Sequence, residues 1–88
     1  MRLKFDFIMT DIGDEIVAVP VGINAHNLHA VLKVNDEGKA IMELLKDDIS
    51  EECIIDSLAH EYSTDRGIIA KYVHEFIEQL RHAKLIAE

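Results

Sequence analysis

The stretch LHAVLKVNDEGKAIMELL, residues 28–45, contains the change from strand to helix that decides the fold. Its first seven residues alternate between apolar and mixed positions, which is the period of a half-buried strand. One face of that strand would carry Leu28, Ala30, Leu32 and Val34, and the other face His29, Val31 and Lys33. From Asn35, a good helix N-cap, the apolar residues recur at helical spacing instead. The pattern therefore predicts a strand over 28–34 followed by a helix.

Two more strands are predicted ahead of this stretch. Phe5, Phe7 and Met9 alternate with smaller or polar residues, and the run 15–21 is nearly all apolar, as in a strand with a neighbour on each side. Residues 12–14 are typical of a tight turn between them. Because short connections favour antiparallel neighbours in chain order, 15–21 would be the central strand and 28–34 an edge strand.

Two further helices are expected in the second half of the chain. The second helix would start at Asp48 or Ser50, between which the sequence does not decide, and the third at Ser63 or Thr64. The inward stripe of the second helix would hold Ile54, Ile55, Leu58, Ala59 and Tyr62, and that of the third Ile69, Val73, Phe76, Ile77 and Leu80. Residues 84–86 would form an extended tail that packs Leu85 and Ile86 under the domain. The predicted class is α+β, with a three-stranded antiparallel sheet followed by three helices.

The composition favours one small folded domain over residues 1–88. Hydrophobic residues make up 49% of the chain and charged residues 30%, with a single proline, which is not the composition of a disordered protein. The net charge of −8 argues against nucleic-acid binding, because attraction to phosphate needs a local excess of Lys and Arg. Acidic residues interrupt the N-terminal segment, and the apolar run 16–23 is too short to cross a membrane. We expect a cytoplasmic protein without an anchor.

No side chains are spaced as a catalytic site or a metal centre would need. The five histidines include no helical i, i+4 pair with the glutamate of a zinc hydrolase, so neither a metal nor a cofactor is expected. Cys53, the single cysteine, sits among Glu51, Glu52 and Asp56, unlike the electropositive setting of a catalytic thiolate. The sequence therefore predicts a protein that is not an enzyme.

Charge is distributed unevenly along the helical half of the chain. Between residues 47 and 65 there are seven acidic residues and no Lys or Arg, whereas the last helix and its tail carry Arg66, Lys71, Arg81 and Lys84. One interpretation is an ordinary solvated surface. The other is that a basic stripe on the last helix meets an acidic ligand while the acidic helix meets a different partner.

The predicted edge strand is the more informative feature. An edge presents unpaired N–H and C=O groups, which form a template for another strand. A lysine on an edge strand, such as Lys33, discourages pairing with another strand, but His29 and Val31 would not prevent an added strand. An extended peptide could hydrogen-bond along 28–34 with its side chains in the groove beside the third helix.

The same stretch resembles the PqqD-like family, also called the RiPP precursor recognition element. Val34-Asn35 followed by AIMELL, residues 40–45, is similar to the family's hydrophobic strand, "LN" and "I-x-x-L" helix start. The apolar spacing of the two later helices extends the resemblance from about Phe7 to Ile86. One departure is Lys84, which stands where a glycine commonly precedes the final Leu-Ile.

The resemblance implies a winged-helix-like domain that binds the leader of a ribosomally made precursor peptide. Family members present that leader to a modifying enzyme, often a radical S-adenosylmethionine enzyme. The leader adds beside the third strand and lies against the third helix. The implied peptide-binding residues are Leu28, His29, Ala30, Val31, Leu32 and Lys33 on the strand, and Ile69, Tyr72, Val73 and Phe76 on the helix.

Two other functions stay open beside this peptide chaperone. A winged-helix DNA-binding domain would use the four basic residues of the last helix, although the net charge and the acidic second helix argue against it. A homodimeric scaffold subunit would pair the edge strand with its own copy. The leading hypothesis is a non-catalytic peptide chaperone whose partners are a leader peptide and a modifying enzyme, with no membrane and no nucleic acid.

Overall fold

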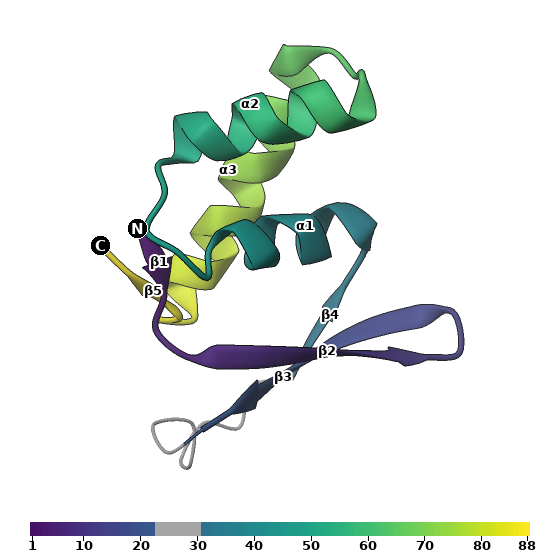
Figure 1. Cartoon of the computed structure of the whole chain (residues 1–88), viewed down its shortest axis with the longest axis vertical. Coiled ribbons are helices and arrows are strands. Elements are labelled where there is room, and N and C mark those ends of the chain that lie inside the picture. The colour runs from purple at the N-terminus through teal and green to yellow at the C-terminus, as the bar shows by residue number, and fades with distance from the viewer. Residues whose placement is uncertain (23–30) are drawn as a thin grey trace.

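The protein has a sheet with three helices on one side of it, where the first helix lies next to the sheet and the second packs on the first and the third (Figure 1). The computed structural model describes residues 1–22 and 31–88. The sheet is antiparallel in the order β2-β3-β4, with bounds β2 (Asp6–Ile12), β3 (Glu15–Val21) and β4 (Leu32–Val34). The helices that follow are α1 (Asp36–Leu44), α2 (Glu51–Tyr62) and α3 (Arg66–His82). The predicted α+β class and the central position of the strand over 15–21 are confirmed.

The register of the sheet sets which side chains reach the helices. β2 and β3 pair along their whole length, and the turn between them contains Gly13 with φ 64°, a conformation that glycine adopts without strain. β4 pairs with β3 through Ile16↔Val34, Val17↔Lys33 and Ala18↔Leu32. Of the strand predicted over 28–34, residues 28–30 lie outside the described residues.

A second, smaller sheet joins the two ends of the chain. β1 (Arg2–Leu3) pairs antiparallel with β5 (Ile86–Ala87), and Leu85 just before β5 is fully buried. The predicted packing of Leu85 and Ile86 is thus confirmed, but Lys84 belongs to a turn and not to the extended tail, and the pairing of the tail with residues 2–3 was not predicted. Lys84 turns the chain from α3 toward β5 with φ 61°. This left-handed conformation explains why a glycine suits the position.

Each helix begins at a side chain that accepts a backbone N–H. Asn35 caps α1, as predicted, and Ser50 caps α2, which decides between the two starts that the sequence left open. The predicted start of the third helix is wrong. Ser63 is left-handed (φ 49°) and ends α2, whereas Asp65 accepts from Gly67 and Ile68 and caps α3.

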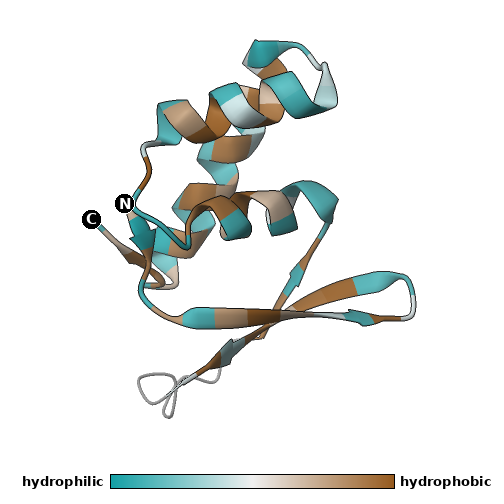
Figure 2. Ribbon diagram, viewed as in Figure 1, coloured by the Kyte–Doolittle hydropathy of each residue, from teal (hydrophilic) through white to brown (hydrophobic). Residues whose placement is uncertain are grey.

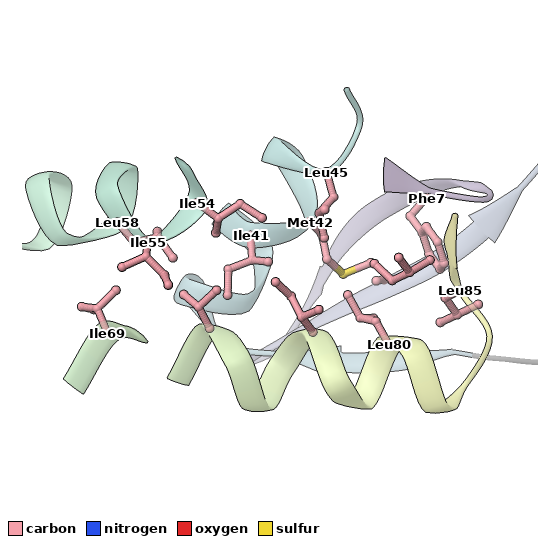
Figure 3. Close-up of a cluster of buried hydrophobic side chains, with 14 residues drawn as sticks. Phe7, Ile41, Met42, Leu45, Ile54, Ile55, Leu58, Ile69, Leu80 and Leu85 are labelled. Carbon is pink, nitrogen blue, oxygen red and sulfur yellow. The ribbon is translucent and has the colours of Figure 1, made fainter. Parts of the chain in front are cut away.

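The hydrophobic core lies between the helices and the inner face of the sheet. Figure 3 shows side chains from α1, α2 and α3 meeting there, with Phe7 of β2 and Leu85 at one end. The predicted inward residues of α3 are buried except for Phe76, which is half-buried beside β4. Among the described helices, none is long and apolar enough to span a membrane.

Candidate functional site

Among the described strands, none pairs with the outer edge of β4. Within residues 1–22 and 31–88, β4 pairs with β3 alone, and the C-terminal strand that might have covered it pairs with β1 instead. The backbone groups of β4 that point away from β3 are therefore open to another strand.

The strand β2 forms the opposite edge of the sheet and is less suited to an added strand. In the described part of the chain it also pairs with one strand only. Asp11 alternates with Phe7 and Met9 and lies opposite Ile16, so it belongs to the inner face. An inward-pointing charge on an edge strand discourages further pairing.

A hollow of about 180 Å³ lies between β4 and α3. Its lining comprises Lys33, Val34, Asn35, Gly38, Tyr72, Glu75, Phe76 and Gln79. The rings of Tyr72 and Phe76 stack in its wall, with centroids 6.4 Å apart and planes 9° from parallel. A Cβ on buried Gly38 would lie 3.2 Å from Val34 Cβ and 3.3 Å from Phe76 Cζ. The missing side chain thus allows α1 to approach β4 and α3 at this point.

Asn35 links the end of β4 to both neighbouring helices. Its Oδ1 accepts the N–H of Gly38 at 2.8 Å and the hydroxyl of Tyr72 at 2.6 Å. Burial raises the pKa of the Tyr72 phenol above its ordinary value, so the hydroxyl keeps its proton at neutral pH and donates it to Asn35.

A second hollow, of about 330 Å³, lies on the other side of Tyr72. Its lining comprises Asn35, Glu37, Tyr62, Thr64, Ile68, Ile69 and Tyr72. Ile68 is 65% exposed there, although it is a large apolar side chain. Because the two hollows share Asn35 and Tyr72, we call them together the α3 groove.

The structure brings part of the predicted peptide-binding set to the α3 groove. The members that line it are Lys33, Ile69, Tyr72 and Phe76. Val31 is 60% exposed just before β4, and Leu32 is half-buried within it. Val73 is wholly buried and lines neither hollow, so it supports the groove from the core. Leu28, His29 and Ala30 lie outside the described residues.

The sequence did not single out several groove residues. Three of them share one helix face with Tyr72: Ile68 lies four residues before it, Glu75 three residues after it and Gln79 seven residues after it. That spacing could have predicted them. Asn35 was predicted only as a cap, because its bond to Tyr72 joins residues 37 positions apart.

The ion pairs of the last helix favour the interpretation of an ordinary solvated surface over that of a basic stripe. Arg66 pairs with Asp56 and with Glu52 of α2, the latter at 2.7 Å, and Arg81 pairs with Glu78 and with Glu88 at 2.6 Å. Lys84 follows the end of α3. Carboxylates thus neutralise both arginines, which removes the main support for DNA binding.

A comparison with known proteins identifies the family of the chain. The family model described as Coenzyme PQQ synthesis protein D (PqqD) matches residues 22–86. The chain belongs to the PqqD family. This confirms the resemblance seen in the strand and helix of residues 28–45.

The PqqD fold of this chain is also found in a solved structure, that of TbiB1 in complex with the TbiA(beta) leader peptide. The two chains superpose with a TM-score of 0.71 over 100% of each, at 23% sequence identity, so the likeness is one of fold. None of the curated proteins matches the chain.

Proposed function

We propose that this PqqD-family chain is a non-catalytic chaperone that binds the leader of a ribosomally made precursor peptide by adding it as a strand to β4. The observation that carries the proposal is the free edge of β4 directly beside the α3 groove. A peptide that extends the sheet here pairs its backbone with β4 and directs alternate side chains toward α3. The likeness to TbiB1, whose solved structure holds a leader peptide, supports the proposal.

The two halves of the α3 groove suit different leader side chains. Around the stacked Tyr72 and Phe76, the first hollow offers the polar side chains of Glu75 and Gln79. The second hollow offers Tyr62, Ile68 and Ile69. We therefore expect a leader with an aliphatic or aromatic side chain for the second hollow and a polar residue near Glu75 and Gln79.

The chain would supply leader recognition, and a separate enzyme would supply the chemistry. The enzyme class that the family resemblance implies is the radical S-adenosylmethionine enzymes. Under this proposal the chain holds the leader while the rest of the precursor reaches the enzyme.

Nuclear magnetic resonance of the ¹⁵N-labelled chain tests the proposal. The titrant is the leader peptide of the precursor encoded beside this chain's gene. Amide shifts are expected at residues 31–35 and along α3 from Ile68 to Gln79. Absence of binding, or shifts confined to β2 (Asp6–Ile12), would contradict it.

A pair of variants adds a test of the groove itself. Phe76→Ala removes part of the aromatic wall, and we expect it to weaken leader binding about tenfold or more, as truncation of a central aromatic contact commonly does. Lys71→Ala is the control, because Lys71 is exposed on α3 and lines neither hollow. Equal leader affinities for both variants would argue against the groove.

A further inference from the structure

The outer face of the sheet, turned away from the helices, carries a second apolar surface. Residues directly opposite each other in paired strands share a face. Ile8 lies opposite Val19, and Val17 lies opposite both Thr10 and Lys33. Alternation adds Ile12 and Val31 to the same face, since Phe7, Met9, Ala18 and Leu32 point inward. We call Ile8, Ile12, Val17, Val19 and Val31 the outer patch.

Solvent reaches most of the outer patch. Four large apolar side chains stand exposed in the described residues, and three of them belong to the patch: Ile8 at 55%, Ile12 at 60% and Val31 at 60%. Val17 is buried yet does not belong to the main core cluster. Figure 2 shows hydrophobic stretches along β2 and β3, with the helices on the other side of the sheet. Such a patch on a sheet face is typical of a protein interface.

The charges around the outer patch indicate what kind of partner fits it. Asp6 and Glu15 share the outer face, Asp14 lies in the turn, and the hairpin 6–21 contains no Lys or Arg. Lys33 lies at the β4 side and is paired with Glu15 at 3.5 Å. A second copy of this chain, itself at −8, would bring like charges together. A partner with an apolar centre rimmed by Lys and Arg is complementary.

We infer that the outer patch is the docking surface for the modifying enzyme, whose matching surface is apolar with a rim of Lys and Arg. This inference rests on the proposed function. The patch faces away from the helices, whereas the α3 groove lies on the helix side of β4. Val31 borders the β4 edge where the leader would add, whereas Ile8 and Ile12 lie on β2 at the opposite edge of the sheet. The β2 side of the patch therefore stays available to the enzyme while β4 holds the leader.

Two crossed variants test the inference. Ile8→Lys changes an exposed residue on β2, the strand farthest from β4, and Ile68→Lys changes an equally exposed apolar residue of the α3 groove. The probes are the purified modifying enzyme encoded beside this gene and the leader peptide, each titrated by calorimetry. We expect Ile8→Lys to weaken enzyme binding more than tenfold with leader affinity unchanged, and Ile68→Lys to do the reverse. Enzyme binding should also weaken as salt is raised.

The outcomes separate this inference from the proposed function. Normal enzyme binding by Ile8→Lys, or no binding of the enzyme by the wild-type chain, overturns the docking surface while leader binding still stands. Light scattering that finds a wild-type dimer converted to a monomer by Ile8→Lys assigns the patch to a second copy and also overturns it. Failure of the wild-type chain to bind the leader overturns the proposed function, and this inference falls with it.

Discussion

The hydroxyl of Tyr72 and the side-chain oxygen of Asn35 lie 2.6 Å apart, and that same oxygen also caps α1 through the N–H of Gly38. One acceptor thus ties the end of β4 and the start of α1 to the middle of α3. The two hollows of the α3 groove meet at this bond. The relative position of β4 and α3, which sets the width of the groove, therefore depends on a contact between residues that both line it.

Tyr72→Phe removes this bond and keeps the aromatic ring that stacks on Phe76. We expect it to lower the free energy of unfolding by about 0.5–1.5 kcal/mol, the usual net contribution of a hydrogen bond. Urea denaturation followed by circular dichroism measures the change. Tyr62→Phe is the control, because the Tyr62 hydroxyl makes no hydrogen bond within the described residues. Equal losses from the two variants would contradict a stabilising role for the Asn35–Tyr72 bond.

Gly38→Ala should destabilise the protein although alanine is the better helix former. Helix propensity alone predicts a gain of about 1 kcal/mol. The added Cβ, however, would lie 3.2 Å from both Asn35 Oδ1 and Val34 Cβ and 3.3 Å from Phe76 Cζ, so its neighbours on three sides must give way by a few tenths of an ångström. We expect a net loss of about 1 kcal/mol or more in thermal or urea unfolding, as overpacking commonly causes.

Gly67→Ala provides the comparison for Gly38→Ala. A Cβ on Gly67 would lie 3.0 Å from Oδ1 of Asp65, the exposed acceptor that caps α3, and near no other atom. The gain in helix propensity and the cost of disturbing this cap are each about 1 kcal/mol and oppose each other. We therefore expect a change near zero. A gain in stability from Gly38→Ala would mean that the added Cβ fits between α1, β4 and α3 without overpacking, and it would contradict the prediction.

Sequence patterns predicted those helices and strands in which apolar residues recur regularly along the chain. The run 15–21 reads as a strand because nearly every side chain is apolar, and β3 has the same bounds. The start of α3 could not be predicted, because Ser63, Thr64 and Asp65 are consecutive and all favour N-caps. The backbone of Ser63 turns left-handed to end α2, and this leaves Asp65 as the cap.

Sequence patterns could not predict contacts between residues that lie far apart in the chain. Two-residue strands such as β1 and β5 have no measurable periodicity, so their pairing was not foreseen. Arg66 looked like part of a free basic stripe, but its partners Glu52 and Asp56 lie on another helix. In the site, the sequence and the family resemblance together predicted Tyr72 and Phe76.

Lys84→Gly should stabilise the protein. Lys84 has φ 61°, a conformation that costs a residue with a side chain about 1 kcal/mol and glycine much less. The side chain is exposed and forms no ion pair within the described part of the chain, so its loss removes no such contact. We expect a rise of about 1 kcal/mol in the free energy of unfolding. Ala83→Gly, at a position with right-handed backbone, is the control and should lower the free energy of unfolding. An increase in the free energy of unfolding from both variants would rule out relief of strain at Lys84.

The alkaline titration of Tyr72 should report its burial. The chain has two tyrosines, so Tyr62→Phe leaves the Tyr72 phenol as the single signal in absorbance at 295 nm. Burial raises the pKa of Tyr72, and its midpoint should therefore lie above the ordinary value of about 10. Because the folded pKa is the higher one, the associated stability is complete below pH 10 and is lost as pH rises through the folded midpoint. A midpoint at or below that of the urea-unfolded chain would contradict the burial.

Strand addition to β4 requires backbone hydrogen bonds between the leader and β4, whereas side-chain contacts in the α3 groove do not require them. Val31 precedes β4, is 60% exposed and has no partner in the register of β3 with β4. Val31→Pro removes an N–H that an added strand could use, and a missing donor at a sheet edge disturbs the fold little. We expect circular dichroism close to wild type and leader binding reduced beyond detection in calorimetry. Val31→Ala keeps the N–H and is expected to bind the leader within a few-fold of wild type. If the folded Val31→Pro chain bound normally, the leader would be held by side-chain contacts in the α3 groove and not by pairing with β4. If both variants lost affinity alike, the leader would need the Val31 side chain and not its N–H, which also contradicts the prediction.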